Sequence, residues 1–400
     1  MNILMVNKFL GPRGGAERCM LTSGSLLAAR GHRVSYFGME DAGNVVGNES
    51  GLYARHRDFH RRGLRGLVNP AELLYSWDAR AKMKKIIEAF RPDVVHLHNI
   101  HFQLTPSVID AAFESGVPVV QTVHDTQILC PSHMMADLAS GHACSLCITH
   151  GRLSCVRRRC IHGSLAKSLL GAAEGALYAR LPQYDRVARY ICPSRYMEGL
   201  LLRTARFAGK TLVIPNCAAL PPIPPGEEKG HYVLYFGRLS AEKGIARLLE
   251  IFRLLPDVPL IVAGSGPLEG EVIRCGLPNV RYAGFLQGEA LARLIAQAAL
   301  TLCLPLWREN CPMAVIESMA LGTPVLASRE GGLPELIEEG VTGMLLDDAS
   351  AHACARAIGT LFADTEALRA MSRACLKARS RRMTPQRYTD ELLGVYRAVL

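Results

Sequence analysis

The stretch LWRENCPMAVIESMALGTPVLAS, residues 306–328, joins an apolar helical pattern to a short apolar run that is typical of a buried strand. Pro312 is a favoured first residue of a helix, and a glycine turn precedes the strand. Two carboxylates, Glu309 and Glu317, interrupt this apolar context. Because glutamates are rarely buried unless a partner or ligand compensates their charge, the stretch predicts an α/β unit that carries a ligand site.

The same alternation of apolar strand and amphipathic helix extends in both directions. Apolar, β-branched runs between helical patterns indicate parallel sheets covered on both faces, so we expect two doubly wound α/β domains. An insertion without regular pattern separates the fourth strand of the first domain from the fifth. The expected strands are NILMV, RVSYFG, DVVHLH, PVVQTVHD, VARYICPS and TLVIPN in the first domain, and YVLYFG, PLIVAG, VRYAGF, LTLCLP and PVLAS in the second.

A proline-rich run, LPPIPPGEEKG at residues 220–230, punctuates the chain. It cannot continue a helix or a central strand, and we interpret it as an interdomain linker. The predicted organisation is a domain at 1–219 with a cysteine-rich insertion at about 125–163, a second domain at 231–383 and a terminal helix at 384–400. Ligands of open α/β sheets bind at the carboxyl ends of the strands, so we expect the site in a cleft between the domains.

Composition excludes several protein classes. The 400 residues exceed one hydrophobic core, and 49% hydrophobic with 20% charged residues is ordinary for a globular protein. An uncharged apolar run of about 18 residues, as a membrane span needs, does not occur. The start, MNILMVN, lacks the basic flank and cleavage site of a signal peptide. We expect a cytoplasmic protein, with peripheral binding to the inner face of the plasma membrane as a further hypothesis.

The positive charge is confined to the first half of the chain. Residues 1–225 hold 27 Lys and Arg against 16 Asp and Glu, whereas residues 226–400 hold 19 against 20. This asymmetry favours an anionic partner for the first half, such as a phosphate-bearing lipid, a membrane surface, an acidic glycan or nucleic acid. Arginines solvated on helix faces are the alternative interpretation.

Residues with the chemistry to bind phosphate follow the strand YVLYFG. Gly237 ends this strand, and the connection to the next helix carries Arg238 and Lys243. A diphosphate needs close backbone approach, amide donors at a helix start and fixed positive charge, which this turn supplies. A surface turn with solvated charges is the alternative for this motif taken alone.

Two further glycine turns support the same prediction. Gly264 and Gly266 follow the next strand, and Gly14 and Gly15 lie at the start of the first helix, where amides can contact phosphate. The turn at Gly14 and Gly15 is neither a dinucleotide fingerprint nor a Walker loop, and a turn like that at Gly264 and Gly266 also closes many α/β units without a ligand. Glu317 on its helix is placed to accept from two vicinal hydroxyls.

Six motifs in this order resemble the retaining glycosyltransferases of the GT-B fold, in particular family 4. They are GGAER, HDTQILCPS, VIPNC, GRLSAEKG, AGSGPLEG and ENCPMAVIESMALGTPVLAS, the last of which matches the family's E-x7-E signature with Glu309 and Glu317. The resemblance covers nearly the whole chain. It implies two Rossmann-like domains facing across a cleft, with the C-terminal helix crossing back to the first domain.

The resemblance also implies roles for individual residues. Arg238 and Lys243 would hold the donor's diphosphate, Glu317 the ribose, and Glu309 the sugar hydroxyls beside the anomeric carbon. His124 would lie near the transferred sugar, although a core histidine is the alternative there. The remaining donor contacts would come from Gly14, Gly15, Gly237, Gly264, Gly266, Asn310, Cys311 and Met313.

The insertion contains five of the thirteen cysteines. Cys144 and Cys147 form C-x2-C, while Cys155 and Cys160 form C-x4-C, a spacing that permits a structural zinc site. Unligated or redox-active thiols are an equal alternative, and an iron–sulfur cluster is a third. Four arginines in the insertion, Arg152 and Arg157 to Arg159, favour an acidic glycan, a lipid diphosphate or a membrane surface.

The function predicted from these observations is sugar transfer with retention, from a nucleotide-diphosphate sugar to a glycan or lipid-linked acceptor in cell-envelope polysaccharide assembly. No cofactor is expected in catalysis, because a D-x-D metal motif is not evident. A nucleotide-sugar epimerase of the same fold is one alternative. A zinc-stabilised nucleic-acid-binding protein is another, but aromatic residues are not interleaved with the basic ones, so no nucleic-acid partner is expected.

Overall fold

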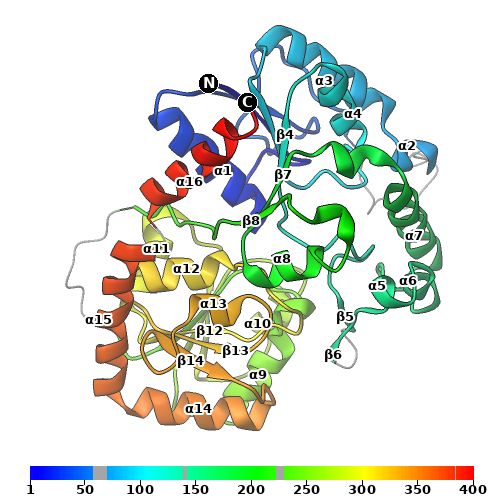
Figure 1. The fold of residues 1–400 in the computed structure, drawn as a ribbon. Coiled ribbons are helices and arrows are strands. Elements are labelled where there is room, and N and C mark those ends of the chain that lie inside the picture. Colours follow the sequence, from blue (N-terminus) through cyan, green and yellow to red (C-terminus); the bar gives the residue numbers. More distant parts are fainter. Residues whose placement is uncertain (57–69, 138–141, 222–228, 383) are drawn as a thin grey trace. The chain divides into compact units, whose positions relative to one another are not determined.

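The computed structural model describes residues 1–56, 70–137, 142–221, 229–382 and 384–400. The chain divides into two compact units (Figure 1). Unit 1 comprises Met1–Met135, Cys144–Ile214 and Thr389–Leu400, and unit 2 comprises Ala136–Ala143 and Pro215–Tyr388. Most of the predicted linker, residues 222–228, lies outside the described residues.

Unit 1 is built on a parallel six-stranded sheet in the order β2-β1-β3-β4-β7-β8. The order reverses between β1 and β3, which creates the switch point where such sheets bind ligands. Its strands are β1 (Asn2–Val6), β2 (Arg33–Phe37), β3 (Val94–Leu97), β4 (Val119–Thr122), β7 (Arg189–Cys192) and β8 (Thr211–Val213).

Unit 2 also has a parallel six-stranded sheet, in the order β11-β10-β9-β12-β13-β14, with the reversal between β9 and β12. The predicted doubly wound α/β architecture is therefore confirmed in each unit. Edge strand β14 was not expected, because GMLL is too short a run to stand out. The strands are β9 (Val233–Phe236), β10 (Leu260–Ala263), β11 (Val280–Gly284), β12 (Leu300–Cys303), β13 (Val325–Ser328) and β14 (Gly343–Leu346).

Helices cover both sheets, and several begin at a serine whose hydroxyl accepts from a backbone amide of the first turn, as at Ser76, Ser164 and Ser350. Unit 1 contains α1 (Gly15–Ala29), α2 (Pro70–Leu74), α3 (Trp77–Phe90), α4 (Ser107–Glu114), α5 (Leu146–Thr149), α6 (Leu153–Arg157), α7 (Leu165–Arg180) and α8 (Arg195–Leu201). Unit 2 contains α9 (Ile245–Arg253), α10 (Glu269–Ile273), α11 (Gly288–Gln297), α12 (Met313–Ala320), α13 (Leu333–Leu336), α14 (Ala351–Ala363) and α15 (Thr365–Arg382).

The expectation that the insertion lacks regular structure is wrong. Within about 125–163 the chain forms the short helices α5 and α6 and a short antiparallel pair, β5 (Ala136–Asp137) and β6 (His142–Ala143), and the 16-residue α7 follows the insertion. Alanine and leucine dominate α7 and have high helix propensity, which explains why this segment is helical.

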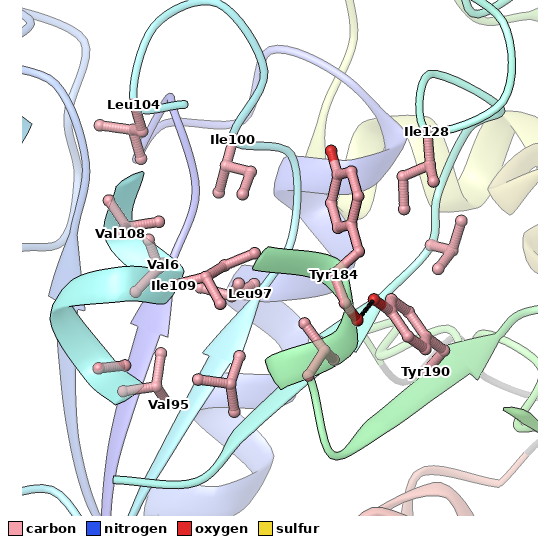
Figure 2. Packing of buried hydrophobic residues seen from close by; sticks show 14 of the residues in the cluster. Val6, Val95, Leu97, Ile100, Leu104, Val108, Ile109, Ile128, Tyr184 and Tyr190 are labelled. Atoms are coloured by element: carbon pink, nitrogen blue, oxygen red, sulfur yellow. Dashed lines mark hydrogen bonds between the residues drawn. The ribbon is translucent and has the colours of Figure 1, made fainter. Parts of the chain in front are cut away.

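The core of unit 1 lies between its sheet and the helices α3 and α4. Figure 2 shows Val95 and Leu97 of β3 packed near Val108 and Ile109 of α4, all four of them fully buried. Every residue of β3 and β4 is buried, as expected for central strands of a sheet that is covered on both faces. At the edge of this core the Tyr190 hydroxyl donates to the Tyr184 carbonyl at 2.6 Å.

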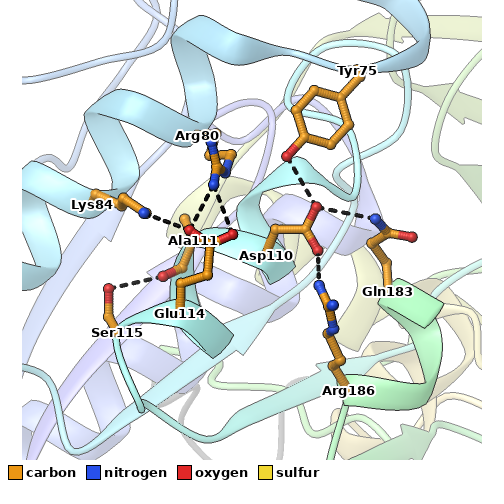
Figure 3. A network of polar contacts seen from close by, with 9 residues as sticks. All are labelled: Tyr75, Arg80, Lys84, Asp110, Ala111, Glu114, Ser115, Gln183 and Arg186. Carbon is orange, nitrogen blue, oxygen red and sulfur yellow. Dashed lines mark hydrogen bonds and ion pairs between the residues drawn. The ribbon is translucent and has the colours of Figure 1, made fainter. Parts of the chain in front are cut away.

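A polar network anchors α4 (Figure 3). The buried carboxylate of Asp110 accepts from the Tyr75 hydroxyl at 3.0 Å, from the Gln183 amide at 3.0 Å and from Arg186. Burial and then the bond to Asp110 raise the pKa of Tyr75, so it remains a donor at neutral pH. Gln183 and Arg186 follow α7, so the network links α4 to that segment. These partners offset the free-energy cost of burying the Asp110 carboxylate.

The last helix, α16 (Pro385–Arg397), contributes its residues from Thr389 onward to unit 1. Arg30 of α1 pairs with Asp390 at 2.9 Å, and the fully buried Tyr396 hydroxyl lies 2.7 Å from His96 Nδ1 on β3. This return of the C-terminal helix to the first domain confirms the expectation. Among the described residues, no helix is long and apolar enough to cross a membrane.

Candidate active site

Two glycine turns meet at the carboxyl edge of the second sheet. Gly237 follows β9 with φ of 143°, and Gly264 follows β10 with φ of 141°. A Cβ on Gly264 would lie 1.9 Å from the Gly237 carbonyl oxygen, so the two turns touch backbone to backbone. Gly266 similarly approaches the Leu239 carbonyl, where a Cβ would lie 2.4 Å away. Only glycine fits these positions, and the packing leaves exposed backbone at the edge of the sheet.

Tyrosine hydroxyls fix the same turns. Tyr235 donates to the carbonyl of Arg238 at 2.9 Å, and Tyr282 donates to the carbonyl of Gly264 at 2.9 Å. The guanidinium of Arg238 belongs to an exposed residue. The backbone of Arg238, which is predicted to bind the diphosphate, is therefore fixed, while its guanidinium faces solvent.

Lys243 and Glu309, predicted from two separate motifs, form an ion pair. Glu309 Oε1 also accepts from Trp307 Nε1 at 2.7 Å, and Lys243 Nζ lies 5.1 Å from the centre of the Trp307 ring. Burial lowers the pKa of Lys243, but attraction to Glu309 outweighs that effect, so the net pKa of Lys243 is raised. The structure thus brings together a firmly protonated cation and a carboxylate that is 9% exposed.

Hydrogen bonds to backbone carbonyls hold the two segments that carry Lys243 and Glu309 together. Lys243 ends a short 3-10 turn, Ala241–Lys243, and the Glu242 carbonyl of that turn accepts from the Leu306 amide at 2.9 Å. Arg247 of α9 donates to the carbonyl of Leu304 at 2.6 Å. The loop after β12 and the turn before α9 are therefore tied together independently of the ion pair.

Glu317 lies on α12, which begins at Met313 with Pro312 as its cap, one residue later than expected. The Glu317 side chain is only 1% exposed. Asn310 and Cys311 are also buried, and Asn216 of the VIPNC motif donates to the Cys311 carbonyl at 3.0 Å. The structure therefore places the second half of E-x7-E on a helix whose preceding loop is held by Asn216.

In unit 1, the loop after β1 leads into α1, which starts at Gly15 with Gly14 as its extended cap. Glu17 in the first turn is buried and accepts from Asn7 Nδ2 at 3.2 Å. Asn7 also accepts from the Asn99 amide at 2.8 Å, which links the ends of β1 and β3. The predicted phosphate contacts Gly14 and Gly15 thus lie at the switch point of the first sheet.

Three histidine rings stack across the neighbouring strand ends. His124 follows β4, and its Nε2 lies 2.7 Å from Nδ1 of His98, which follows β3. The ring centres are 5.1 Å apart for His98 and His124, and 4.4 Å apart for His96 and His98. His96 Nε2 in turn contacts the Thr122 hydroxyl at 2.7 Å.

All three imidazoles are neutral at pH 7. Burial lowers the pKa of His96 to about 3 and that of His124 to about 4, and burial followed by the neighbouring rings holds the pKa of His98 well below its usual value. His98 Nε2 is buried without a hydrogen-bond partner among the described residues. Because orphaned N–H donors are the rarer case, we assign His98 Nδ1–H as the donor to His124. His124 then carries its proton on Nδ1.

The predicted zinc ligands are only partly brought together. The Cys147 thiol contacts Cys155, which contacts Cys160, but the other neighbour of Cys147 is Cys130. In the described part of the chain, no group of three or more His, Cys, Asp or Glu side chains is arranged to hold a metal ion. Zinc at Cys144, Cys147, Cys155 and Cys160 stays a prediction.

Sequence reasoning missed several residues around the site. Trp307 lies two positions before Glu309 and donates to its carboxylate. No sequence pattern indicates that a tryptophan in a loop makes such a hydrogen bond. His98 belongs to the expected strand DVVHLH and was read only as part of it. Tyr396 contacts His96 across 300 residues of sequence, which no local pattern reveals.

Family models match most of the chain. Residues 13–220 match the model described as Glycosyltransferase Family 4, and residues 220–377 match the one described as Glycosyl transferases group 1. The GDP-mannose-dependent alpha-(1-6)-phosphatidylinositol dimannoside mannosyltransferase of Mycobacterium tuberculosis is 33% identical over 100% of this chain and 97% of its own length.

Other similarities are shorter or more distant. Sulfoquinovosyl transferase SQD2 of Arabidopsis thaliana is 32% identical, but the match covers 35% of this chain and 28% of that protein. D-inositol 3-phosphate glycosyltransferase of Segniliparus rotundus is 32% identical over 42% of this chain and 40% of its own length. The solved sucrose-phosphate synthase of Thermosynechococcus elongatus has a TM-score of 0.71 at 20% identity, covering 100% of this chain and 98% of that one. It shares the fold.

Proposed function

The chain belongs to glycosyltransferase family 4, and from this premise we propose that it is a retaining glycosyltransferase. It moves a sugar from a nucleotide-diphosphate sugar to a glycan or lipid-linked acceptor in cell-envelope polysaccharide assembly. The observation that carries the proposal is the pairing of Lys243 with Glu309 beside the glycine turns of β9 and β10. A cation and a carboxylate at one strand edge suit a ligand with a phosphate next to a sugar.

Lys243 and Arg238 stabilise the leaving group in this proposal. The bond between the anomeric carbon and the diphosphate oxygen breaks, and its electron pair stays on the diphosphate. The acceptor oxygen bonds to the same face of the sugar, while its proton passes to the departing phosphate oxygen. Since negative charge grows on the diphosphate during the step, fixed cations stabilise the transition state more than the bound donor.

Carboxylates and amides of the α12 region bind the rest of the donor. Glu317 accepts from the ribose hydroxyls, and Glu309 accepts from the sugar. Glu309 also pairs with Lys243. The ion pair keeps Lys243 protonated and Glu309 oriented before the donor arrives, which reduces the reorganisation that binding requires. The amides near Asn310, Cys311 and Met313 lie at the start of α12, where a helix favours anions.

Unit 1 supplies a histidine and further amides. Gly14 and Gly15 at the start of α1 offer amides to phosphate. His124, with its proton on Nδ1, offers a neutral donor to a sugar hydroxyl.

The acceptor is proposed to carry a lipid. A relative that spans this whole chain is named for a phosphatidylinositol dimannoside, an anionic glycolipid. The excess of positive charge in residues 1–225 fits such an acceptor and the anionic membrane surface around it.

A donor screen tests the proposal. Purified protein is melted in the presence of UDP-, GDP- and ADP-sugars, because a ligand that binds only the folded state at about 100 times its Kd adds about 2.7 kcal/mol of stability. We expect one nucleotide sugar to raise the Tm clearly and Lys243→Met to abolish the shift, whereas Arg253→Ala, an exposed cation on the same unit, keeps it. An NMR spectrum of the product then reports anomeric configuration. No shift with any nucleotide sugar, or an inverted product, would contradict the proposal.

A further inference from the structure

An open groove of about 660 Å³ lies between the short helices of the insertion and the helix that follows them in unit 1. Its walls come from α5, α6 and α7, which contact one another in sequence order and are seen side by side in Figure 1. The lining is mostly apolar, with Leu153, Leu169, Ala173 and Ala176 on the walls and Arg152 and Arg180 among them. None of the three stacked histidines of unit 1 lines this groove.

The groove exists because one face of α7 carries alanines where larger residues would fill the space. Leu169 and Leu153 flank them and remain 55% and 62% exposed, and Leu165 on the same helix is 54% exposed. Single exposed leucines are ordinary, but a group of them around a hollow marks a binding surface.

The chain segment that supplies most of the groove is strongly positive. Between His142 and Arg180 the chain has six Lys and Arg and a single acid, Glu174. That acid is 3% exposed and faces His101 at 3.3 Å, so this segment presents no carboxylate to solvent. Arg157, Arg158 and Arg159 at the end of α6 are all exposed.

Arg152 adds a second indication of an anionic ligand. Its Nη2 donates to the Ile128 carbonyl at 3.3 Å, while its Nη1 is buried with no hydrogen-bond partner among the described residues. Gly175 of α7 makes room for it, since a Cβ there would lie 3.3 Å from Arg152 Nε. Nη1 is enclosed by the protein, but Arg152 as a whole lies on the wall of the groove and brings a positive charge there that suits a phosphate.

We propose that this groove binds a hydrocarbon chain of an anionic membrane phospholipid, whose phosphate lies among Arg152, Arg180 and the exposed arginines of α6. The inference deepens the acceptor half of the proposed function and rests on it, because it places unit 1 on the membrane that carries a lipid-linked acceptor. An apolar groove with two arginines on its lining matches an amphiphile better than a free glycan, which has no apolar chain to bury.

The test compares binding to sedimented vesicles of phosphatidylcholine with and without phosphatidylglycerol. The wild-type chain should bind the anionic vesicles preferentially. Filling the groove with Ala173→Leu and Ala176→Leu should weaken that binding by about tenfold or more, because each methylene kept out of an apolar site loses about fourfold. Ala370→Leu, at an exposed helical position of unit 2, is the matched control and should bind as wild type.

Two outcomes would overturn the inference. If the filled variant binds anionic vesicles like wild type, the contact is electrostatic only and no chain enters the groove. If a soluble acidic glycan displaces the protein from vesicles and the filled variant binds that glycan more weakly, the occupant is a glycan. The donor screen is run on the same variants. Loss of vesicle binding with an intact donor shift separates this site from the transferase site, whereas a wild type without any donor shift counts against the proposed function alone.

Discussion

Acidification should destabilise unit 1 through its three stacked histidines. Each imidazole has a folded-state pKa below that of an unfolded histidine, so its neutral form is stabilised by folding. The stability this provides is present above the unfolded pKa of about 6.5 and is lost as pH falls from there towards the folded values of about 4 and about 3.

The magnitude follows from proton linkage. At about pH 5.5 an unfolded histidine gains about RT ln 11, or about 1.4 kcal/mol, by binding a proton that the buried ring refuses. Three such rings make a loss of about 4 kcal/mol between about pH 8 and about pH 5.5. Carboxylates add little in this window, because their unfolded pKa values lie near 4.

The chain offers a selective assay. Its two tryptophans are Trp77 in unit 1 and Trp307 in unit 2, so a Trp307→Phe background leaves Trp77 as reporter of unit 1. Trp77 packs against Tyr75 at 4.5 Å between ring centres, a contact that unfolding removes. Urea unfolding is followed at both pH values, with and without His96→Gln. The substitution should reduce the pH dependence by about 1.4 kcal/mol. Identical pH dependence in the two proteins would refute the reasoning.

Other predictions concern the candidate site. Arg238→Ala and Lys243→Ala should each lower kcat by about 100-fold or more through lost stabilisation of the leaving group, and near-normal turnover in both would remove that role. Glu317→Ala should weaken donor binding by about 1 to 3 kcal/mol, measured by calorimetry against Glu330→Ala as an exposed control; equal affinities would reject the ribose contact. Metal analysis should find about one zinc per chain if the cysteines of the insertion are ligated. Metal-free, folded protein would dismiss the zinc hypothesis.

Strands and most of their connections were predictable because a strand buried on both faces must be apolar along its whole length. NILMV and PLIVAG carry that signature, whereas GMLL of β14 is short and lies at an edge, so its pattern does not stand out. The insertion was misjudged for another reason. Its helices α5 and α6 are only 4 and 5 residues long, which is too short for a helical periodicity to stand out in the sequence.

The residues of the site that belong to sequence motifs were predictable, whereas their contacts with one another were not. Lys243 and Glu309 were each recognised, but their direct pairing depends on how the loop after β12 meets the turn before α9, which is a tertiary property. The same limit applies to Asn216, which supports the Cys311 carbonyl from a different motif. Local patterns identify residue types and strand ends, whereas partners distant in sequence are determined by packing.

The return of Thr389–Leu400 to unit 1 determines the order in which the protein can fold during synthesis. Domains usually fold as they leave the ribosome, the N-terminal one first. Tyr396, which contacts His96 of β3, is synthesised 300 residues after it. The face of unit 1 that Tyr396 buries therefore remains exposed to solvent until unit 2 has been translated. The nascent first unit therefore exposes apolar surface through that interval, and chaperones that shield such surface should matter more for this chain than for proteins whose halves are each contiguous in sequence.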